Sequence, residues 1–243
     1  TTGGALAVVA TVERIITDPM RRMPCHHHVL QGRYFLQPWC HTAGAILKWY
    51  RDTFGLMEIE AANKVGLDPY DILTLEASRV PPGSNGLVLL PHFAGAASPE
   101  FNPDAKGVLY GLTLYHGRAH VIRAILESIA YMIRRNVELL EELGVKVREV
   151  RSTGGGARSH LWNQIKADVL QRPILTVHTE ETAALGAAML AGLGAGTFNS
   201  LEEAARIMIS IKNKMAPSES NKAVYDKQYR TYVELYKSLQ TLF

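Results

Sequence analysis

Three consecutive glycines, Gly154, Gly155 and Gly156, constrain the fold of this chain more than any other feature. A short β-like run, VREV at residues 147–150, precedes them and favours a β-strand. The segment after them is expected to form an amphipathic helix, because four large apolar residues recur there at helical spacing: Leu161, Trp162, Ile165 and Val169. The glycines are therefore predicted to lie at a strand-to-helix turn, as in an α/β fold.

Such a turn favours a nucleotide as its ligand. Glycine has no Cβ atom, so the three residues can take positive φ and allow a ring or a phosphate to approach the backbone. Free N–H groups at the start of the next helix favour negative charge. Tight packing alone is the other explanation of a glycine-rich turn. The segment is neither a Walker loop, because no Gly-Lys-Ser/Thr follows, nor a GxGxxG fingerprint.

A second cluster of small residues, TEETAALGAAMLAGLGAG at residues 179–196, predicts a helix almost without bulky side chains. One face of this helix carries Ala183, Gly186, Ala187, Leu190 and Gly194. Such a face can approach another backbone closely, which suits a helix that slides or pivots. Ordinary close packing explains the same pattern.

Five segments in order resemble the C-terminal domain of the FGGY carbohydrate kinases, in particular xylulokinase-like and glycerol kinase-like members. They are TTGGALAVV at residues 1–9, HTAGAILKWYRDTFG at residues 41–55, residues 87–134, the glycine turn and the small-residue helix. The resemblance spans nearly the whole chain. It implies an RNase H-like α/β domain of the actin-like ATPase type, with a mixed β-sheet flanked by helices, formed by residues 1–243 as a single unit.

The resemblance also implies where a nucleotide binds. Thr1, Thr2 and Gly3 would contact the phosphates, because hydroxyl and glycine N–H groups donate to phosphate oxygens. Gly44 and Lys48 would lie beside the nucleotide, although a solvated helix face also explains a single lysine. The adenosine would contact four residues of the glycine turn and the following helix: Gly155, Gly156, Ala157 and His160. The small-residue helix would connect two domains.

The activity implied by the resemblance is transfer of the γ-phosphoryl group of Mg-ATP to a sugar or polyol hydroxyl. ATP and Mg²⁺ are the implied cofactors, and a homo-oligomer is the implied assembly. No segment matches the family's first phosphate loop or catalytic aspartate, and the chain begins at Thr1, as a fragment without its N-terminal domain would. We therefore expect no catalytic residue here and no activity from the isolated chain. The sequence GAASP at residues 95–99 replaces the Gly-Glu-Arg of many relatives and indicates a different, unnamed sugar.

Two other functions are compatible with a late glycine turn. A non-catalytic actin-like module would bind nucleotide and a partner, but the kinase-like segments at residues 41–54 and 91–107 favour the kinase. A dinucleotide-dependent oxidoreductase would need its glycine turn in the first βα unit and an acidic ribose ligand after the next strand. The position of the turn makes the oxidoreductase the weaker alternative.

Composition excludes further classes. The 243 residues are 47% hydrophobic, with no apolar run near the roughly 20 residues of a membrane span. The net charge of +3 is dispersed, so nucleic acid is not an expected partner. Cys25 and Cys40 show neither metal nor disulfide spacing, which favours the cytoplasm. Three histidines at residues 26–28 suggest zinc, but adjacent side chains diverge and no further ligands complete a set, so we name no metal site.

Hydrophobic periodicity predicts the remaining elements. Strands are expected at residues 5–11, 33–37, 87–91, 146–151 and 174–178, with the histidines in a connection after the first. Helices are expected at residues 43–54, 58–64, 69–76, 118–143 and 222–243. In the longest, Ile122, Ile125, Ile129, Ile133, Val137 and Leu140 form an apolar stripe, and Gly144 is placed to end it.

Overall fold

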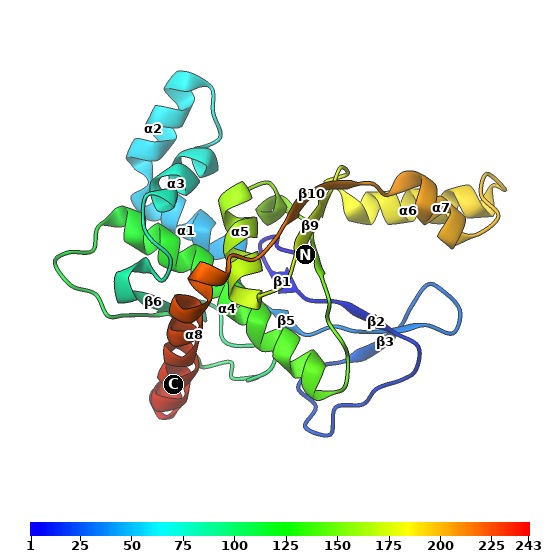
Figure 1. Ribbon diagram of the computed structural model, residues 1–243, viewed down its shortest axis with the longest axis horizontal. Helices are drawn as coiled ribbons and strands as arrows, with labels where there is room; N and C mark the ends of the chain where they lie inside the picture. Colours follow the sequence, from blue (N-terminus) through cyan, green and yellow to red (C-terminus); the bar gives the residue numbers. More distant parts are fainter.

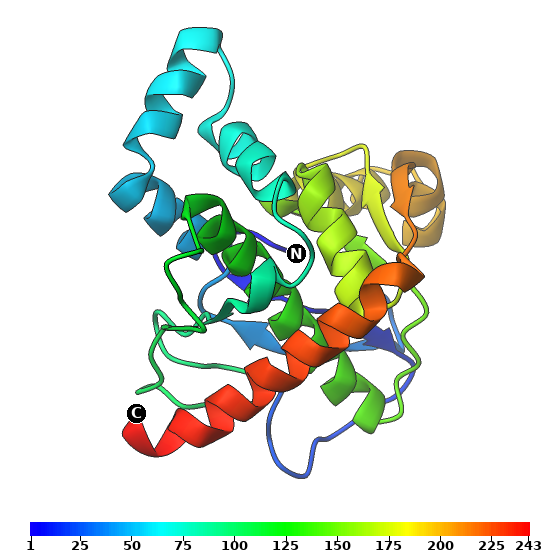
Figure 2. The same cartoon turned by 60° about the vertical axis from the view of Figure 1, so that its left-hand side comes forward.

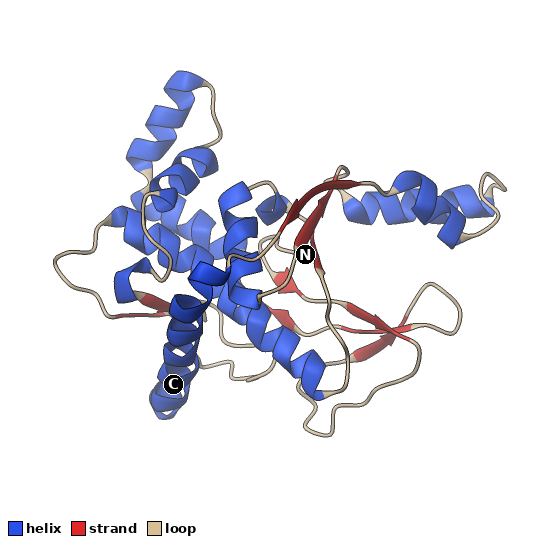
Figure 3. Cartoon of the chain, viewed as in Figure 1, coloured by secondary structure: helices blue, strands red, loops and turns tan.

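Helices dominate the secondary structure, and the strands are short. The computed structural model describes all residues 1–243 (Figures 1 and 3). The helices are α1 (Gly44–Phe54), α2 (Leu56–Val65), α3 (Pro69–Ser78), α4 (Arg118–Glu142), α5 (His160–Leu170), α6 (Thr182–Gly194), α7 (Leu201–Met208) and α8 (Glu219–Leu239). The strands are β1 (Leu6–Ala7), β2 (Ala10–Val12), β3 (Cys25–His27), β4 (Tyr34–Leu36), β5 (Trp39–Cys40), β6 (Val88–Leu90), β7 (Val108–Tyr110), β8 (Val150–Ser152), β9 (Ile174–Val177) and β10 (Ile211–Met215).

The strands confirm an α/β chain, but they form four small sheets. β8 pairs with β9 in parallel and β10 pairs with β9 antiparallel, so this sheet is mixed. The other sheets, β1-β5, β2-β4-β3 and β6-β7, are antiparallel.

All five predicted strands are shorter than expected, and two of them differ most from the prediction. The strand predicted at residues 5–11 divides because β1 pairs with β5 whereas β2 pairs with β4, and Pro38 between those partners has no N–H to continue the ladder. Val8 still donates to the Pro38 carbonyl at 3.0 Å. The strand predicted at residues 146–151 begins only at Val150, since the Arg172 Nε takes the Val147 carbonyl at 2.7 Å in place of a neighbouring strand.

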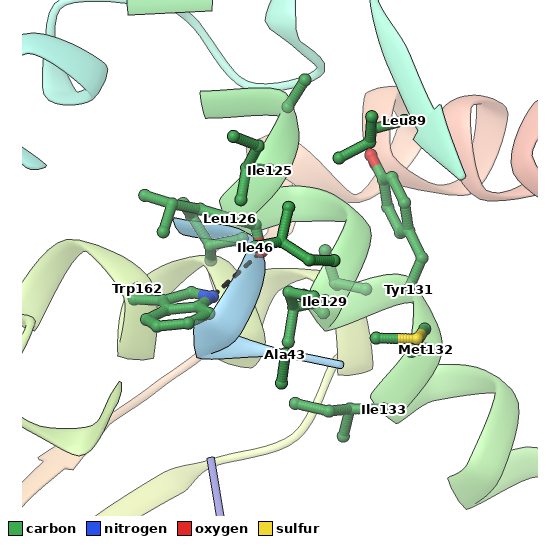
Figure 4. Packing of buried hydrophobic residues seen from close by; sticks show 14 of the residues in the cluster. Ala43, Ile46, Leu89, Ile125, Leu126, Ile129, Tyr131, Met132, Ile133 and Trp162 are labelled. Carbon is green, nitrogen blue, oxygen red and sulfur yellow. Dashed lines mark hydrogen bonds between the residues drawn. The ribbon is translucent and has the colours of Figure 1, made fainter. Parts of the chain in front are cut away.

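The long helix α4 lies at the centre of the core. All six residues of its predicted apolar stripe are buried, and Gly144 follows its end with φ +84°, as expected. Helices α3, α5 and α8 and strand β6 pack against α4. Ala43 and Ile46 at the start of α1 and Trp162 of α5 meet α4, and the Trp162 Nε1 donates to the Leu126 carbonyl at 3.0 Å (Figure 4). Both α1 and α5 are therefore anchored on the buried helix α4.

Helices α6 and α7 pack on each other and project from one end of the molecule (Figures 1 and 2). Met189 is the one buried residue of α6. Ala183, Ala187, Leu190 and Gly194 of its small-residue face are exposed. Within this chain, close packing therefore does not explain that face.

The sequence predicted that the three histidines lie in a connection, and this is wrong for two of them, because only His28 lies outside a strand. His26 and His27 belong to β3, and their rings lie 5.1 Å from those of Phe35 and Tyr34 on β4. No group of three or more His, Cys, Asp or Glu side chains is placed to hold a metal ion. No helix is both long enough and apolar enough to cross a bilayer.

Candidate nucleotide site

Three segments that are far apart in the sequence meet at the amino end of the chain. Thr2 and the glycine turn exchange backbone hydrogen bonds: Thr2 N–H donates to the Thr153 carbonyl at 2.9 Å, and Gly156 N–H donates to the Thr2 carbonyl at 3.0 Å. On the other side, Gly44 N–H at the start of α1 donates to the Gly3 carbonyl at 2.9 Å. Residues 1–4 are thus held between α1 and the turn before α5.

Close contact with neighbouring atoms requires glycine at Gly44, Gly154 and Gly156. A Cβ atom on Gly154 would lie 2.9 Å from the Thr2 carbonyl oxygen. A Cβ atom on Gly44 would lie 2.6 Å from the Gly3 carbonyl oxygen. A Cβ atom on Gly156 would lie 2.9 Å from the Thr2 side chain and 3.0 Å from the Trp162 ring. Gly44 and Gly156 therefore let the three segments approach each other, which is a packing role at the centre of the predicted site.

The backbone of the turn differs in part from the expectation. Gly154 has φ +80° and ψ −178°, a conformation that favours glycine. Gly155 and Gly156 do not have positive φ, so that expectation is wrong for both residues. They begin a single 3-10 turn, Gly155–Ala157, which explains their ordinary φ values.

Gly155 is the residue of the turn that faces open space. A Cβ atom placed on it would meet no atom within 4 Å. The N–H groups of Gly154 and Gly155 donate to no acceptor in the protein. Two adjacent free amides beside an uncrowded glycine provide donors for an anionic or polar ligand.

A polar cavity of about 330 Å³ opens beside the turn. Of the predicted residues, Ala157 and His160 line it, together with Gly154. Thr1 and Thr2 line a second cavity, of about 350 Å³, on the other side of Ser152. The two cavities adjoin, because Ser152 contributes to both walls. The other predicted residues line neither cavity: Gly3, Gly44, Lys48, Gly155 and Gly156.

Lys48 lies outside both cavities. Its Nζ is 2.5 Å from Asp52 Oδ2 one turn further along α1, and its side chain is 62% exposed. The ammonium group of Lys48, which was predicted to contact the nucleotide, therefore forms an ion pair within α1. Contact with a nucleotide remains a prediction for this residue.

Several polar residues of the first cavity were not predicted from the sequence. Asp68 and Asp71 come from the start of α3, and Lys212 comes from β10. Arg158, which follows the turn, forms an exposed ion pair with Glu180, and its Nη2 lies 2.8 Å from Glu180 Oε2. Arg158 could have been found from its position next to the glycines, whereas the others depend on tertiary contacts.

Residues 1–195 match the FGGY family of carbohydrate kinases, C-terminal domain. A gluconokinase of Bacillus licheniformis is 33% identical over 241 residues, covering 99% of this chain and 47% of that protein. A gluconokinase of Bacillus subtilis is 34% identical over 248 residues, covering 100% of this chain and 46% of that protein. The chain therefore spans about half the length of these curated relatives.

The fold is also similar to that of solved kinases. The crystal structure of xylulose kinase from Rhodospirillum rubrum superposes with a TM-score of 0.84 at 30% identity, covering 99% of this chain and 46% of that one. This similarity confirms the actin-like ATPase fold. The chain belongs to the FGGY family of carbohydrate kinases, and it corresponds to the C-terminal domain of that family.

Proposed function

We propose that this chain is the nucleotide-binding half of an ATP-dependent carbohydrate kinase, which transfers the γ-phosphoryl group of Mg-ATP to a sugar or polyol hydroxyl. One observation carries the proposal. Residues 1–4 are held between α1 and a glycine turn, and two N–H groups of that turn, those of Gly154 and Gly155, have no acceptor in the protein. A family-level assignment to carbohydrate kinases supports the reaction type.

The residues present fit a nucleotide better than they fit a metal ion. Free backbone amides and threonine hydroxyls donate to phosphate oxygens and to the edge of a base. The chain has no cluster of three side chains able to ligate a metal. Mg²⁺, when bound with ATP, would offset phosphate charge. In this chain, residues 1–4 and the glycine turn would orient the nucleotide and limit its access to water.

A second domain would supply the aspartate base, the first phosphate loop and most sugar contacts. Residues 1–243 would form one domain, and the exposed small-residue face of α6 would meet the other domain and allow closure. Gluconokinases and a xylulose kinase among the relatives make sugar acids and ketoses the first acceptors to test. A cytoplasmic location and a homo-oligomeric state belong to the same proposal.

The isolated chain is expected not to phosphorylate sugars. Transfer needs a positioned base and an aligned acceptor, and both would come from the second domain. A coupled ADP-release assay with gluconate, xylulose, glycerol and a panel of other sugars and polyols measures this directly. Sustained sugar-dependent turnover by the purified chain would refute the assignment of catalysis to a second domain. Activity of the complete gene product distinguishes a kinase from a non-catalytic actin-like module.

Gly155→Val is expected to weaken adenine-nucleotide binding by at least about tenfold, or about 1.4 kcal/mol. The branched side chain would occupy the open space beside the free amides, while it meets no protein atom that would destabilise the fold. Calorimetric titration with ADP, paired with thermal melts, measures both quantities. Gly186→Val is the matched control, because Gly186 is also uncrowded and lies on α6. Unchanged affinity in a folded Gly155→Val protein would leave the turn with a packing role alone.

A further inference from the structure

A lysine is buried directly beneath the glycine turn. Lys166 of α5 is only 2% exposed. Its Nζ donates to Ser152 Oγ at 3.1 Å, to the Gly156 carbonyl at 3.3 Å and to Asn163 Oδ1 at 3.4 Å. The ammonium thus ties together the end of β8, the turn and α5.

Asn163 supports the same turn at the next residue. Its side chain is fully buried, and its Nδ2 donates to the Ala157 carbonyl at 2.7 Å. Two buried side chains of α5 therefore hold two consecutive carbonyls, those of Gly156 and Ala157. This arrangement fixes the turn whose Gly154 and Gly155 amides are free.

The charge of Lys166 has no partner in the protein. All three acceptors are neutral oxygens, and the Trp162 ring lies 4.9 Å from Nζ. Lys166 lines the second cavity, to which α4 and β9 contribute only apolar side chains. The other charged groups there are Lys146, Glu149, Arg151 and the amino group of Thr1, and none of these forms an ion pair with Lys166. Asp168 on the same helix instead accepts from Ser218, Asn221 and Gln164.

A buried ammonium without a counter-charge is costly, because burial removes its hydration. The cost falls when an anion binds nearby. Thr1 and Thr2, the predicted phosphate contacts, line the same cavity as Lys166. A bound nucleotide would bring several negative charges to this part of the protein.

We propose that Lys166 is a positioning residue of the nucleotide site, which holds the glycine turn from below and whose charge is balanced by the phosphates of the bound nucleotide. Nucleotide binding is then coupled to protonation of this lysine. The inference rests on the proposed function, since it requires a nucleotide at the turn.

The direction of the coupling follows from burial. Burial lowers the pKa of Lys166 to about 7, so the side chain is partly neutral in the free protein near neutral pH. Bound phosphates would raise this pKa, and the complex would take up a proton. Nucleotide affinity is then highest at a pH below the pKa of Lys166 in the free protein. It decreases as the pH rises toward the pKa of Lys166 in the complex. Each unit by which the nucleotide raises the pKa corresponds to about tenfold in affinity.

Calorimetric titration with Mg-ADP at about pH 6.5 and about pH 8.5, in buffers of different ionisation enthalpy, tests the coupling. The proteins are the wild type, Lys166→Met and Lys237→Met, a control whose exposed lysine pairs only with Glu234. We expect uptake of about half a proton near pH 7 by the wild type and the control, and less by Lys166→Met. The ratio of wild-type to Lys166→Met affinity should fall severalfold, up to about tenfold, between the two pH values. The nucleotide's own titration is common to all three proteins and cancels in the ratio.

A purely structural role of Lys166 gives a different result. Lys166→Met would then bind more weakly by the same factor at both pH values, with unchanged proton uptake, and this outcome would overturn the proposal. If Lys166→Met does not fold, Lys166→Gln takes its place in the same comparison, because the nucleotide's own titration cancels only between two proteins. Absence of any nucleotide binding by the wild type would instead overturn the proposed function as well.

Discussion

Trp162→Ala should lower the free energy of unfolding by about 3–5 kcal/mol, the usual cost of removing a buried tryptophan. The indole is 3% exposed, packs against α4 and donates from Nε1 to the Leu126 carbonyl (Figure 4). The cavity left behind would lie under the glycine turn, because the ring is the neighbour that a Cβ atom on Gly156 would meet at 3.0 Å. Nucleotide affinity should therefore fall in the protein that remains folded.

Urea denaturation, monitored by circular dichroism, measures the decrease in the free energy of unfolding. Trp49→Ala is the matched control, since Trp49 is 42% exposed and should cost less than about 1 kcal/mol. A loss below about 1 kcal/mol for Trp162→Ala would contradict the placement of this side chain in the core that supports the site.

Arg123→Met should destabilise the chain by a similar amount, about 3–5 kcal/mol at pH 7. Arg123 Nε donates to Glu127 at 2.8 Å, and the Glu127 carboxylate also accepts from Gly83 N–H and Ser84 Oγ at 2.9 Å each. Arg123 also donates to the Tyr225 hydroxyl at 2.7 Å, which joins α8 to α4. Without the guanidinium, Glu127 is a buried carboxylate with no counter-charge.

The pH dependence identifies the cause of the Arg123→Met loss. Burial raises the pKa of Glu127 above its ordinary value, and removal of Arg123 would raise it further. The folded variant then binds a proton that the unfolded chain releases above about pH 4.3, so the loss should be smaller at pH 5 than at pH 7. The double variant Arg123→Met/Glu127→Leu should lose less than Arg123→Met alone. Equal losses for the single and double variants would contradict the proposed role of the charge.

Local sequence patterns predicted the helices and strands whose formation is determined by the residues within them. The strand, glycine turn and helix around residues 150–170 are present, because glycine conformation and helical periodicity act over a few residues. The bounds of α4 match to within one residue, since its apolar stripe is long and Gly144 ends it. Helix α7 and strand β10 were missed, because α7 is short and the residues of β10 read IKNKM, with little apolar pattern.

The site was predictable only in part, because contacts between distant segments do not follow from local sequence patterns. The resemblance selected residues 1–3, Gly44 and Gly156, and backbone hydrogen bonds join Thr2 to Gly156 and Gly3 to Gly44. It could not reveal that Lys48 pairs with Asp52, because a rotamer depends on neighbours. The support that Lys166 gives the turn was also missed, since a lysine on an amphipathic helix is normally expected at the surface.

Titration of the isotope-labelled chain with Mg-ADP, followed by NMR of the backbone amides, tests most directly whether this domain binds the nucleotide. Saturable binding should shift the Gly154 and Gly155 amides together with those of residues 2–4 and the start of α1. Exposed residues of β3 at the far sheet should remain unchanged. No binding at millimolar Mg-ADP, or shifts confined to residues outside the glycine turn, would contradict a nucleotide site at this turn.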